Sequence, residues 1–188
     1  MNQGESLLVD GNVNAGETVT ANQRIQVTLL TGDVCATYES RFYTLRPEEQ
    51  WSNNYYNPVA THNGDPTFVF LYNNESSAIN VEWETSSGVQ GTISVPAGGV
   101  NHVQIPNNTG SFFYSVGGEN FYAIATIDSD PSQTTDHDWG FALIPSSQLS
   151  SQITMVGFAP GQDPTYCTST NVISKAAWSI QYLSLIHI

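Results

Sequence analysis

The chain has 188 residues and a strongly acidic balance, with 4 Lys and Arg against 17 Asp and Glu and a formal net charge of −13. This balance excludes nucleic acid as a partner, because proteins bind phosphate backbones through clustered Lys and Arg side chains. No stretch approaches the roughly 20 apolar residues of a membrane-spanning helix, so no membrane insertion is expected. The length suits one domain, large enough to fold without a metal or a disulfide. Few Lys residues beside abundant Asn, Ser, Thr, Gly and Tyr are typical of secreted β proteins.

Short apolar runs predict strands along most of the chain. In chain order these runs are 25–31, 67–72, 79–85, 91–95, 100–105, 111–116, 121–127, 140–144 and 153–157. The alternation in 79–85 predicts that Ile79, Val81 and Trp83 face the core and that the polar residues between them face solvent. Turn-forming Asn, Ser and Gly residues separate the runs, and PAGG (96–99) predicts a hairpin between its neighbours.

These patterns predict an all-β fold, an antiparallel β-sandwich of about 8–11 short strands. Helix is scarce, and at most one or two single turns are expected. LRPEEQW (45–51) predicts one turn, with Pro47 at the first helical position and acidic residues at its positive end. PSSQLS (145–150) predicts another.

The two cysteines, Cys35 and Cys167, leave their redox state open. A bridge between them would close a long loop and stabilise the fold by about 4–5 kcal/mol in the loop-entropy model. The alternative is two free thiols, which the sequence favours because neither residue belongs to a cysteine pattern.

Both ends of the sequence suggest a piece of a longer protein. The first ten residues lack the basic and apolar regions of a signal peptide, so we expect that the natural start is missing. LSLIHI (183–188) resembles the translated end of a sequencing adapter, the alternative being a natural C-terminal strand. We therefore expect one sandwich domain over 1–165, an uncertain tail over 166–182 and an adapter-derived scar over 183–188.

The most concentrated charge lies in DSDPSQTTDHDWG (128–140), which contains two D-x-D pairs. The four carboxylates are Asp128, Asp130, Asp136 and Asp138. Closely spaced oxygen ligands suit calcium, although Pro131 and Gln133 break the order of an EF-hand loop. Zinc is disfavoured because His137 is the one nitrogen ligand nearby. The alternative is an acidic loop whose aspartates cap turns and bond backbone amides.

A second cluster, WSNNYYNPV (51–59), combines aromatic rings with amides. Trp51, Tyr55 and Tyr56 are candidates for stacking on sugar rings, as on a carbohydrate-binding surface. The alternative is that these rings close the open end of the sandwich around Pro58, as large aromatic side chains commonly do.

No familiar catalytic signature is present, and we predict that the protein is not an enzyme. Glu82 and Glu84 share a strand face as a glycosidase pair would, but alternation explains them as solvated residues. His62 and His102 could each serve as a general base, yet no nucleophile accompanies them.

Four segments carry a resemblance to a known family: 31–59, 70–85, 121–149 and 156–165. In order and spacing they resemble blocks of a domain of large secreted and surface proteins of bacteria, similar to the N-terminal domain of IgGFc-binding protein. The resemblance covers about residues 31–165, and 166–182 departs from the pattern. It implies a β-rich, non-enzymatic module in an extracellular multidomain chain. Immunoglobulin binding belongs to the namesake and is not carried over.

Together these observations predict a non-catalytic, extracellular or cell-surface module of a larger bacterial protein. Its expected task is adhesion through contact with a protein or a glycan, and no cofactor other than calcium is expected. Two alternatives stay open: a carbohydrate-binding accessory domain or secreted hydrolase, and a structural spacer.

The calcium site has a direct test. If Asp128, Asp130, Asp136 and Asp138 bind calcium in the native state alone, excess calcium raises the thermal unfolding midpoint and EDTA lowers it. The midpoint should follow calcium concentration in differential scanning calorimetry, with magnesium as the control. An unchanged midpoint would contradict the calcium site.

Overall fold

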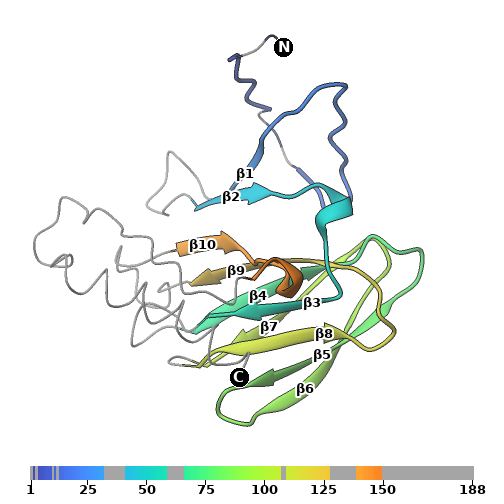
Figure 1. Cartoon of the computed structure of the whole chain (residues 1–188), viewed down its shortest axis with the longest axis vertical. Coiled ribbons are helices and arrows are strands. Elements are labelled where there is room, and N and C mark those ends of the chain that lie inside the picture. Colours follow the sequence, from blue (N-terminus) through green and yellow to red (C-terminus); the bar gives the residue numbers. More distant parts are fainter. Residues whose placement is uncertain are drawn as a thin grey trace, which may run out of the picture.

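A computed structural model describes residues 2, 4–9, 11, 13–31, 41–58, 66–106, 109–127 and 139–149 of the chain (Figure 1). The described residues form ten strands and two single 3-10 turns, and every strand pairing is antiparallel. Two four-stranded sheets pack together, and a two-stranded sheet lies beside them. The predicted all-β sandwich is confirmed, as are its strand number and its scarcity of helix.

The first sheet has the strand order β10-β9-β4-β7. Its strands are β4 (Thr67–Tyr72), β7 (Val100–Ile105), β9 (Tyr122–Ile127) and β10 (Trp139–Ala142). In β4, Val69 and Leu71 face the sandwich core and are 0% exposed. Phe70 and Tyr72 alternate with them and therefore lie on the outer face, where they are only half-buried.

The second sheet has the order β3-β8-β5-β6. Its strands are β3 (Asn54–Asn57), β5 (Ile79–Thr85), β6 (Gln90–Val95) and β8 (Ser111–Ser115). In β5, Ile79 and Val81 are buried and Trp83 packs against the edge of the core, as the alternation predicted. Asn80 and Glu84 are exposed on the opposite face.

One hydrophobic core fills the space between the two sheets. Its buried members are Tyr55, Val69, Leu71, Ile79, Val81, Val95, Val103, Ile105, Phe113, Phe121, Ala123, Ala125 and Leu143. Burial of each large apolar side chain stabilises the fold by about 1.5–3 kcal/mol. Because both sheets contribute to the core, it fixes which face of each strand points outward.

The prediction that PAGG (96–99) joins two strands that pair with each other is wrong. The turn is tight, since the Gly99 N–H donates to the Pro96 carbonyl at 3.1 Å and Gly98 has φ +60°. However, β6 pairs with β5 and β7 pairs with β4, so the turn carries the chain from one sheet to the other. A local turn signal does not specify which sheet the next strand joins.

The two-stranded sheet lies across the first sheet and consists of β1 (Val27–Thr31) and β2 (Arg41–Leu45) (Figure 1). The sequence predicted neither β2 nor β3 as a strand. The predicted single turns are confirmed as η1 (Glu48–Gln50) and η2 (Ser146–Gln148).

Several predictions lie outside the described residues: the strand at 153–157, Cys35, Cys167, the tail over 166–182 and the segment 183–188. Within the described part of the chain, no helix is long and apolar enough to cross a membrane.

Gly140 lets β2 pack closely on β10. A Cβ atom added at Gly140 would lie 2.4 Å from Cζ and Oη of Tyr43, which is buried. Gly140→Ala should therefore lower the free energy of unfolding by about 1–3 kcal/mol, the usual cost of overpacking. In urea unfolding, the same change in a Tyr43→Leu background should cost clearly less, because the clashing ring is gone. Equal costs in the two backgrounds would contradict this contact.

Candidate functional site

The three aromatic residues that were predicted to form one ligand-binding surface lie in three different places. Trp51 precedes β3, whereas Tyr55 and Tyr56 are neighbours within it. Successive side chains of a strand point to opposite faces, so these two tyrosines cannot share one surface. Tyr55 points into the core and Tyr56 to the outer face of the second sheet.

Tyr55 is a core residue with a satisfied hydroxyl. It is 0% exposed, its Oη accepts the Ser52 N–H at 2.9 Å, and it donates to the Phe121 carbonyl at 2.7 Å. Its ring lies 5.1 Å from that of Phe121. Burial raises the pKa of Tyr55 to about 12. A ligand does not reach this ring, so Tyr55 is not part of the site described below.

Tyr56 belongs to a stack of rings on the outer face of the second sheet. Its ring stacks on Phe112 at a centroid distance of 4.5 Å, and Phe112 stacks on Tyr114 at 5.5 Å. The Tyr114 hydroxyl donates to Glu82 Oε2, and this bond raises the pKa of Tyr114. Burial, followed by the negative charge of Glu84, raises the pKa of Tyr56. The Phe112 ring lies between the other two, and the stacking covers one face of Tyr56 and one face of Tyr114.

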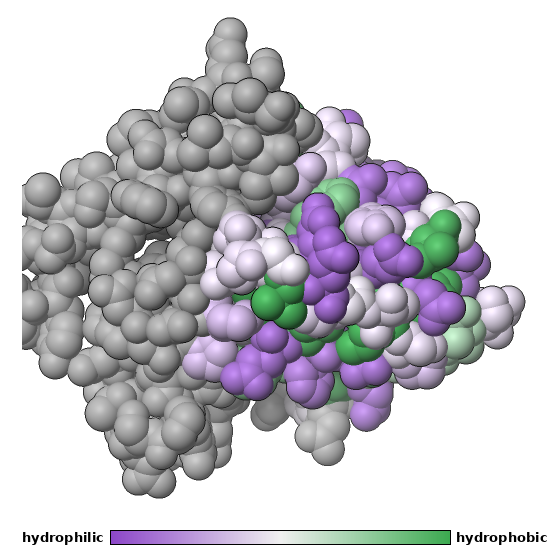
Figure 2. All heavy atoms as spheres, turned by 90° about the horizontal axis from the view of Figure 1, so that it is seen from below, coloured by the Kyte–Doolittle hydropathy of each residue, from purple (hydrophilic) through white to green (hydrophobic). Residues whose placement is uncertain are grey.

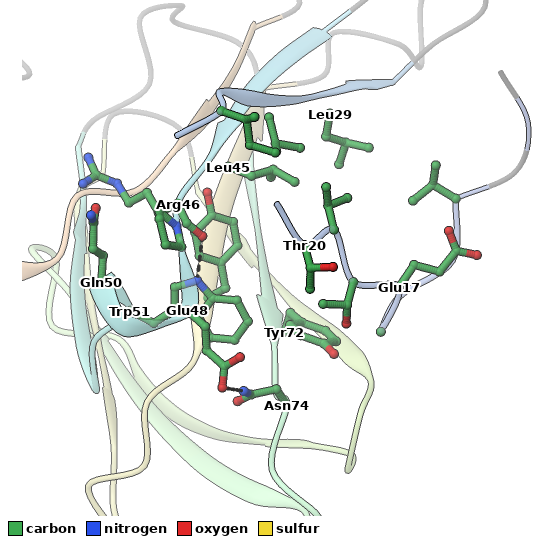
Figure 3. A pocket seen from close by; sticks show the side chains of 18 of the residues that line it. Glu17, Thr20, Leu29, Leu45, Arg46, Glu48, Gln50, Trp51, Tyr72 and Asn74 are labelled. Carbon is green, nitrogen blue, oxygen red and sulfur yellow. Dashed lines mark hydrogen bonds between the residues drawn. The ribbon is translucent and has the colours of Figure 1, made fainter. Parts of the chain in front are cut away.

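Trp51 lines an open crevice of about 1540 Å³ between the β1–β2 sheet and the outer face of the first sheet (Figure 3). Figure 3 shows Leu29 and Leu45 on one side of the crevice and Trp51 and Tyr72 on the opposite side. The crevice is larger than the roughly 300–1,000 Å³ of typical small-molecule pockets. Its size suits a ligand that extends over several chemical units.

The position of Trp51 is set by the turn that precedes it. The turn η1 ends at Trp51, and the indole Nε1–H donates to the Arg46 carbonyl at 3.1 Å. Its ring meets Tyr72 edge-to-face at 5.8 Å and Tyr122 at 5.4 Å. Tyr122 is itself fixed, since its hydroxyl donates to the Thr44 carbonyl at 3.2 Å. Burial raises the pKa of Tyr122. Trp51 is thus held in one orientation while remaining partly exposed.

Polar groups line the rim of the crevice, next to its floor, which Trp51 and Tyr72 form (Figure 3). The Asn74 amide donates to Glu48 Oε1 at 2.5 Å, which brings together the start of η1 and the segment after β4. Arg46 donates through Nη1 to Gln148 at 2.6 Å. The rim therefore combines an amide, carboxylates and a guanidinium beside apolar rings, as ligand-binding clefts commonly do.

The segment 13–25 closes one side of the crevice. It contributes small apolar residues together with polar ones, among them Thr20 and the carboxylate of Glu17 (Figure 3). Gly16 has φ +94°, and a Cβ added there would lie 3.6 Å from the Tyr72 hydroxyl oxygen. Glycine therefore allows the segment to turn beside Tyr72.

The predicted calcium ligands Asp128, Asp130, Asp136 and Asp138 lie outside the described residues, as does His62. Among the residues that the structure describes, no group of three or more His, Cys, Asp or Glu side chains is placed to hold a metal. His102 lies on β7 with its ring 5.3 Å from that of Phe70 and 6.0 Å from that of Phe68.

Sequence reasoning found Trp51 but missed Tyr72, Tyr122, Glu48 and Asn74. A usable signal was present in TFVFLY (67–72), where both faces of the strand are apolar or aromatic. Such a run indicates a strand that is covered on both sides. It did not indicate which part of the chain provides the second cover.

No family model, curated protein or solved structure matches the chain. The resemblance to the N-terminal domain of IgGFc-binding protein therefore stays a prediction.

The buried hydroxyl of Tyr55 gives a pH-dependent prediction. Folding raises the pKa of Tyr55, so the native state holds the phenol proton more tightly than the unfolded state does. The resulting contribution to the free energy of unfolding is present below pH 10 and is lost as the pH rises toward 12. Tyr55→Phe should lower the free energy of unfolding at neutral pH by about 1–3 kcal/mol, because the Ser52 N–H loses its acceptor. Urea unfolding at several pH values should also show a smaller loss of stability above pH 10 in the variant. Identical pH profiles would contradict this assignment.

Proposed function

We propose that the protein is a non-catalytic module of a larger secreted or surface protein of bacteria, and that it binds neutral glycans in the crevice beside Trp51. The observation that carries the proposal is the placement of a partly exposed, rigidly held indole ring at the floor of this crevice. The acidic, Lys-poor composition supports a secreted or surface location.

The chemistry of the crevice suits a sugar chain. A sugar ring has an apolar C–H face, which can pack on Trp51 or Tyr72, and hydroxyl groups, which can bond the rim. Glu48 and Asn74 offer acceptors and donors beside these rings. Rigid aromatic contacts with a few placed polar groups are the usual means by which a cleft orients its ligand.

The charges of the crevice favour neutral glycans over acidic ones. Glu17, Glu48 and Glu49 line it, whereas its cations are Arg24 and Arg46. Arg46 already bonds Gln148. A sulfated or uronic-acid chain would meet more negative than positive charge, and like charges at short range disfavour binding.

The placement of one candidate carboxylate pair favours binding over hydrolysis. A retaining or inverting glycosidase uses two carboxyl groups that flank the scissile bond. Glu82 and Glu84, which share a strand face, lie on the second sheet, away from the crevice.

The proposal is tested by isothermal titration calorimetry with neutral, acidic and amino-sugar oligosaccharides. Neutral oligosaccharides should bind, and Trp51→Ala should weaken binding by about tenfold, which corresponds to roughly 1.4 kcal/mol. Asn74→Ala, a change of a rim residue, should weaken binding without removing the aromatic floor.

Tyr114→Phe is the matched control, because it changes an aromatic residue on the outer face of the other sheet. It should leave glycan affinity unchanged. Failure of the natural protein to bind any neutral glycan would overturn the proposal. So would an equal loss of affinity in Tyr114→Phe and Trp51→Ala, since the effect would then not be local to the crevice.

A further inference from the structure

The strand β6 forms one edge of the second sheet. It pairs with β5, and no other described strand lies on its opposite side. Its outward side chains, Gln90, Thr92 and Ser94, are exposed. In Figure 1 it is the lowest strand, and Figure 2 views the molecule from below that orientation. The described surface seen there is mostly hydrophilic, and its hydrophobic residues are scattered.

The pairing on β5 determines which backbone groups of β6 point outward. The Thr85 N–H donates to the Val89 carbonyl at 2.8 Å, whereas the Asn80 carbonyl accepts the Val116 N–H on the far side of β5. In an antiparallel ladder these orientations alternate. Val89, Gly91 and Ile93 therefore bond β5, while the intervening residues direct their backbone groups away from the sheet.

The free backbone groups are consequently those of Gln90 and Thr92, together with the Ser94 N–H. The Ser94 carbonyl accepts the Asn101 amide at 2.9 Å, which agrees with its outward direction. An edge of this kind can accept another strand unless charges, proline, a bulge or shortness prevent it. The sequence QGTISV of β6 contains neither charge nor proline.

The edge strand β3 of the same sheet contrasts with β6. It has four residues, and Tyr55 within it forms an isolated bridge with Pro145, so part of that edge is covered. The six-residue β6 has no such described cover. An additional strand therefore fits the β6 edge of this sheet and not its β3 edge.

The two faces beside β6 differ in chemistry. On the inner face, Ile93 is half-buried against the core, and Trp83 packs directly over Gly91. On the outer face, Glu82 and Glu84 lie on β5, opposite Thr92 and Gln90. The Glu82 carboxylate accepts the Tyr114 hydroxyl on β8 and is therefore directed away from β6, whereas Glu84 is exposed. A strand added beside β6 would lie about 10 Å, two strand spacings, from the backbone of β5. Long basic side chains on its outer face would reach toward Glu84.

We propose that β6 binds an extended polypeptide segment that adds a strand to the second sheet. The segment alternates apolar residues, which cover Ile93 and Trp83, with Lys or Arg residues, which face Glu84. Backbone hydrogen bonds to Gln90 and Thr92 provide affinity, and the alternating side chains provide specificity. This site is independent of the proposed glycan crevice, because that crevice lies on the other sheet.

Charge selects this occupant over a second copy of the same chain. The formal net charge is −13, so two copies repel each other. Pairing β6 with its own copy would also bring the Glu82 and Glu84 faces of both copies into one continuous sheet. A basic partner has the complementary charge and gains in association rate from it.

The test uses the whole protein and two synthetic peptides, one alternating Lys with Val and one alternating Glu with Val. Fluorescence anisotropy should show binding of the Lys peptide, weakened by salt, and at least tenfold weaker binding of the Glu peptide. Thr92→Pro should weaken binding of the Lys peptide at least tenfold. The fold should survive this change, because the Thr92 N–H points away from β5 and proline is tolerated at such edge positions.

Thr92→Val is the matched control: it retains the N–H and the β-branched shape, and its affinity should equal that of the natural protein. Glu84→Gln should weaken binding of the Lys peptide and reduce its salt dependence. Equal binding of the Lys peptide to Thr92→Pro, or equal binding of both peptides, would overturn the proposal. A dimer in sedimentation that Thr92→Pro dissociates would also overturn it, in favour of a second copy as occupant.

Discussion

The architecture depends on strand β4 being apolar on both faces. Val69 and Leu71 complete the core between the two main sheets, whereas Phe70 and Tyr72 face the opposite way. A sheet with apolar residues on both faces needs cover on both, as in folds whose strands read as continuous hydrophobic runs. Here the second cover is small: the β1–β2 sheet, Trp51 and the segment 13–25. Because this cover fits the outer face incompletely, a crevice remains between them.

The contact between Tyr43 and Gly140 holds that cover at one end. Tyr43 is buried although its strand contains exposed neighbours, and its ring occupies the space that a side chain at position 140 would fill. At the other end, η1 turns the chain and delivers Trp51 against Tyr122. The crevice is therefore bounded by two fixed contacts. This explains how an aromatic side chain stays half exposed without collapsing into the core.

The sequence predicted the parts of the fold that follow from local pattern. The alternation of 79–85 correctly assigned Ile79 and Val81 to the core, and the proline-led turns appeared at both predicted places. Strand β2 was missed because RFYTL carries only one buried residue, so its pairing with β1 and its packing on β10 decide its structure. The PAGG turn was assigned to the wrong pairing because sheet membership depends on β4 and β5, which lie far away in sequence.

The candidate site was less predictable for the same physical reason. Proximity in sequence suggested that Trp51, Tyr55 and Tyr56 act together, but strand alternation separates the two tyrosines and a turn sends Trp51 to the other sheet. The residues that do meet Trp51 come from β4 and β9, and the segment after β4 joins the site through Glu48. A site assembled across sheets is fixed by tertiary packing, and single-sequence patterns describe neighbours along one element.

The scarcity of basic residues bears on the proposed strand-binding edge at β6. Soluble β proteins commonly protect edge strands with Lys, and this chain has one Lys among its 188 residues. The β6 edge is polar but uncharged, and it keeps the outward backbone groups of Gln90 and Thr92 available to a partner. Glu84 and the negative charge of the chain then disfavour acidic strands, including those of another copy. An acidic surface beside an open edge therefore restricts pairing to basic partners, whereas a fully protected edge would prevent pairing altogether.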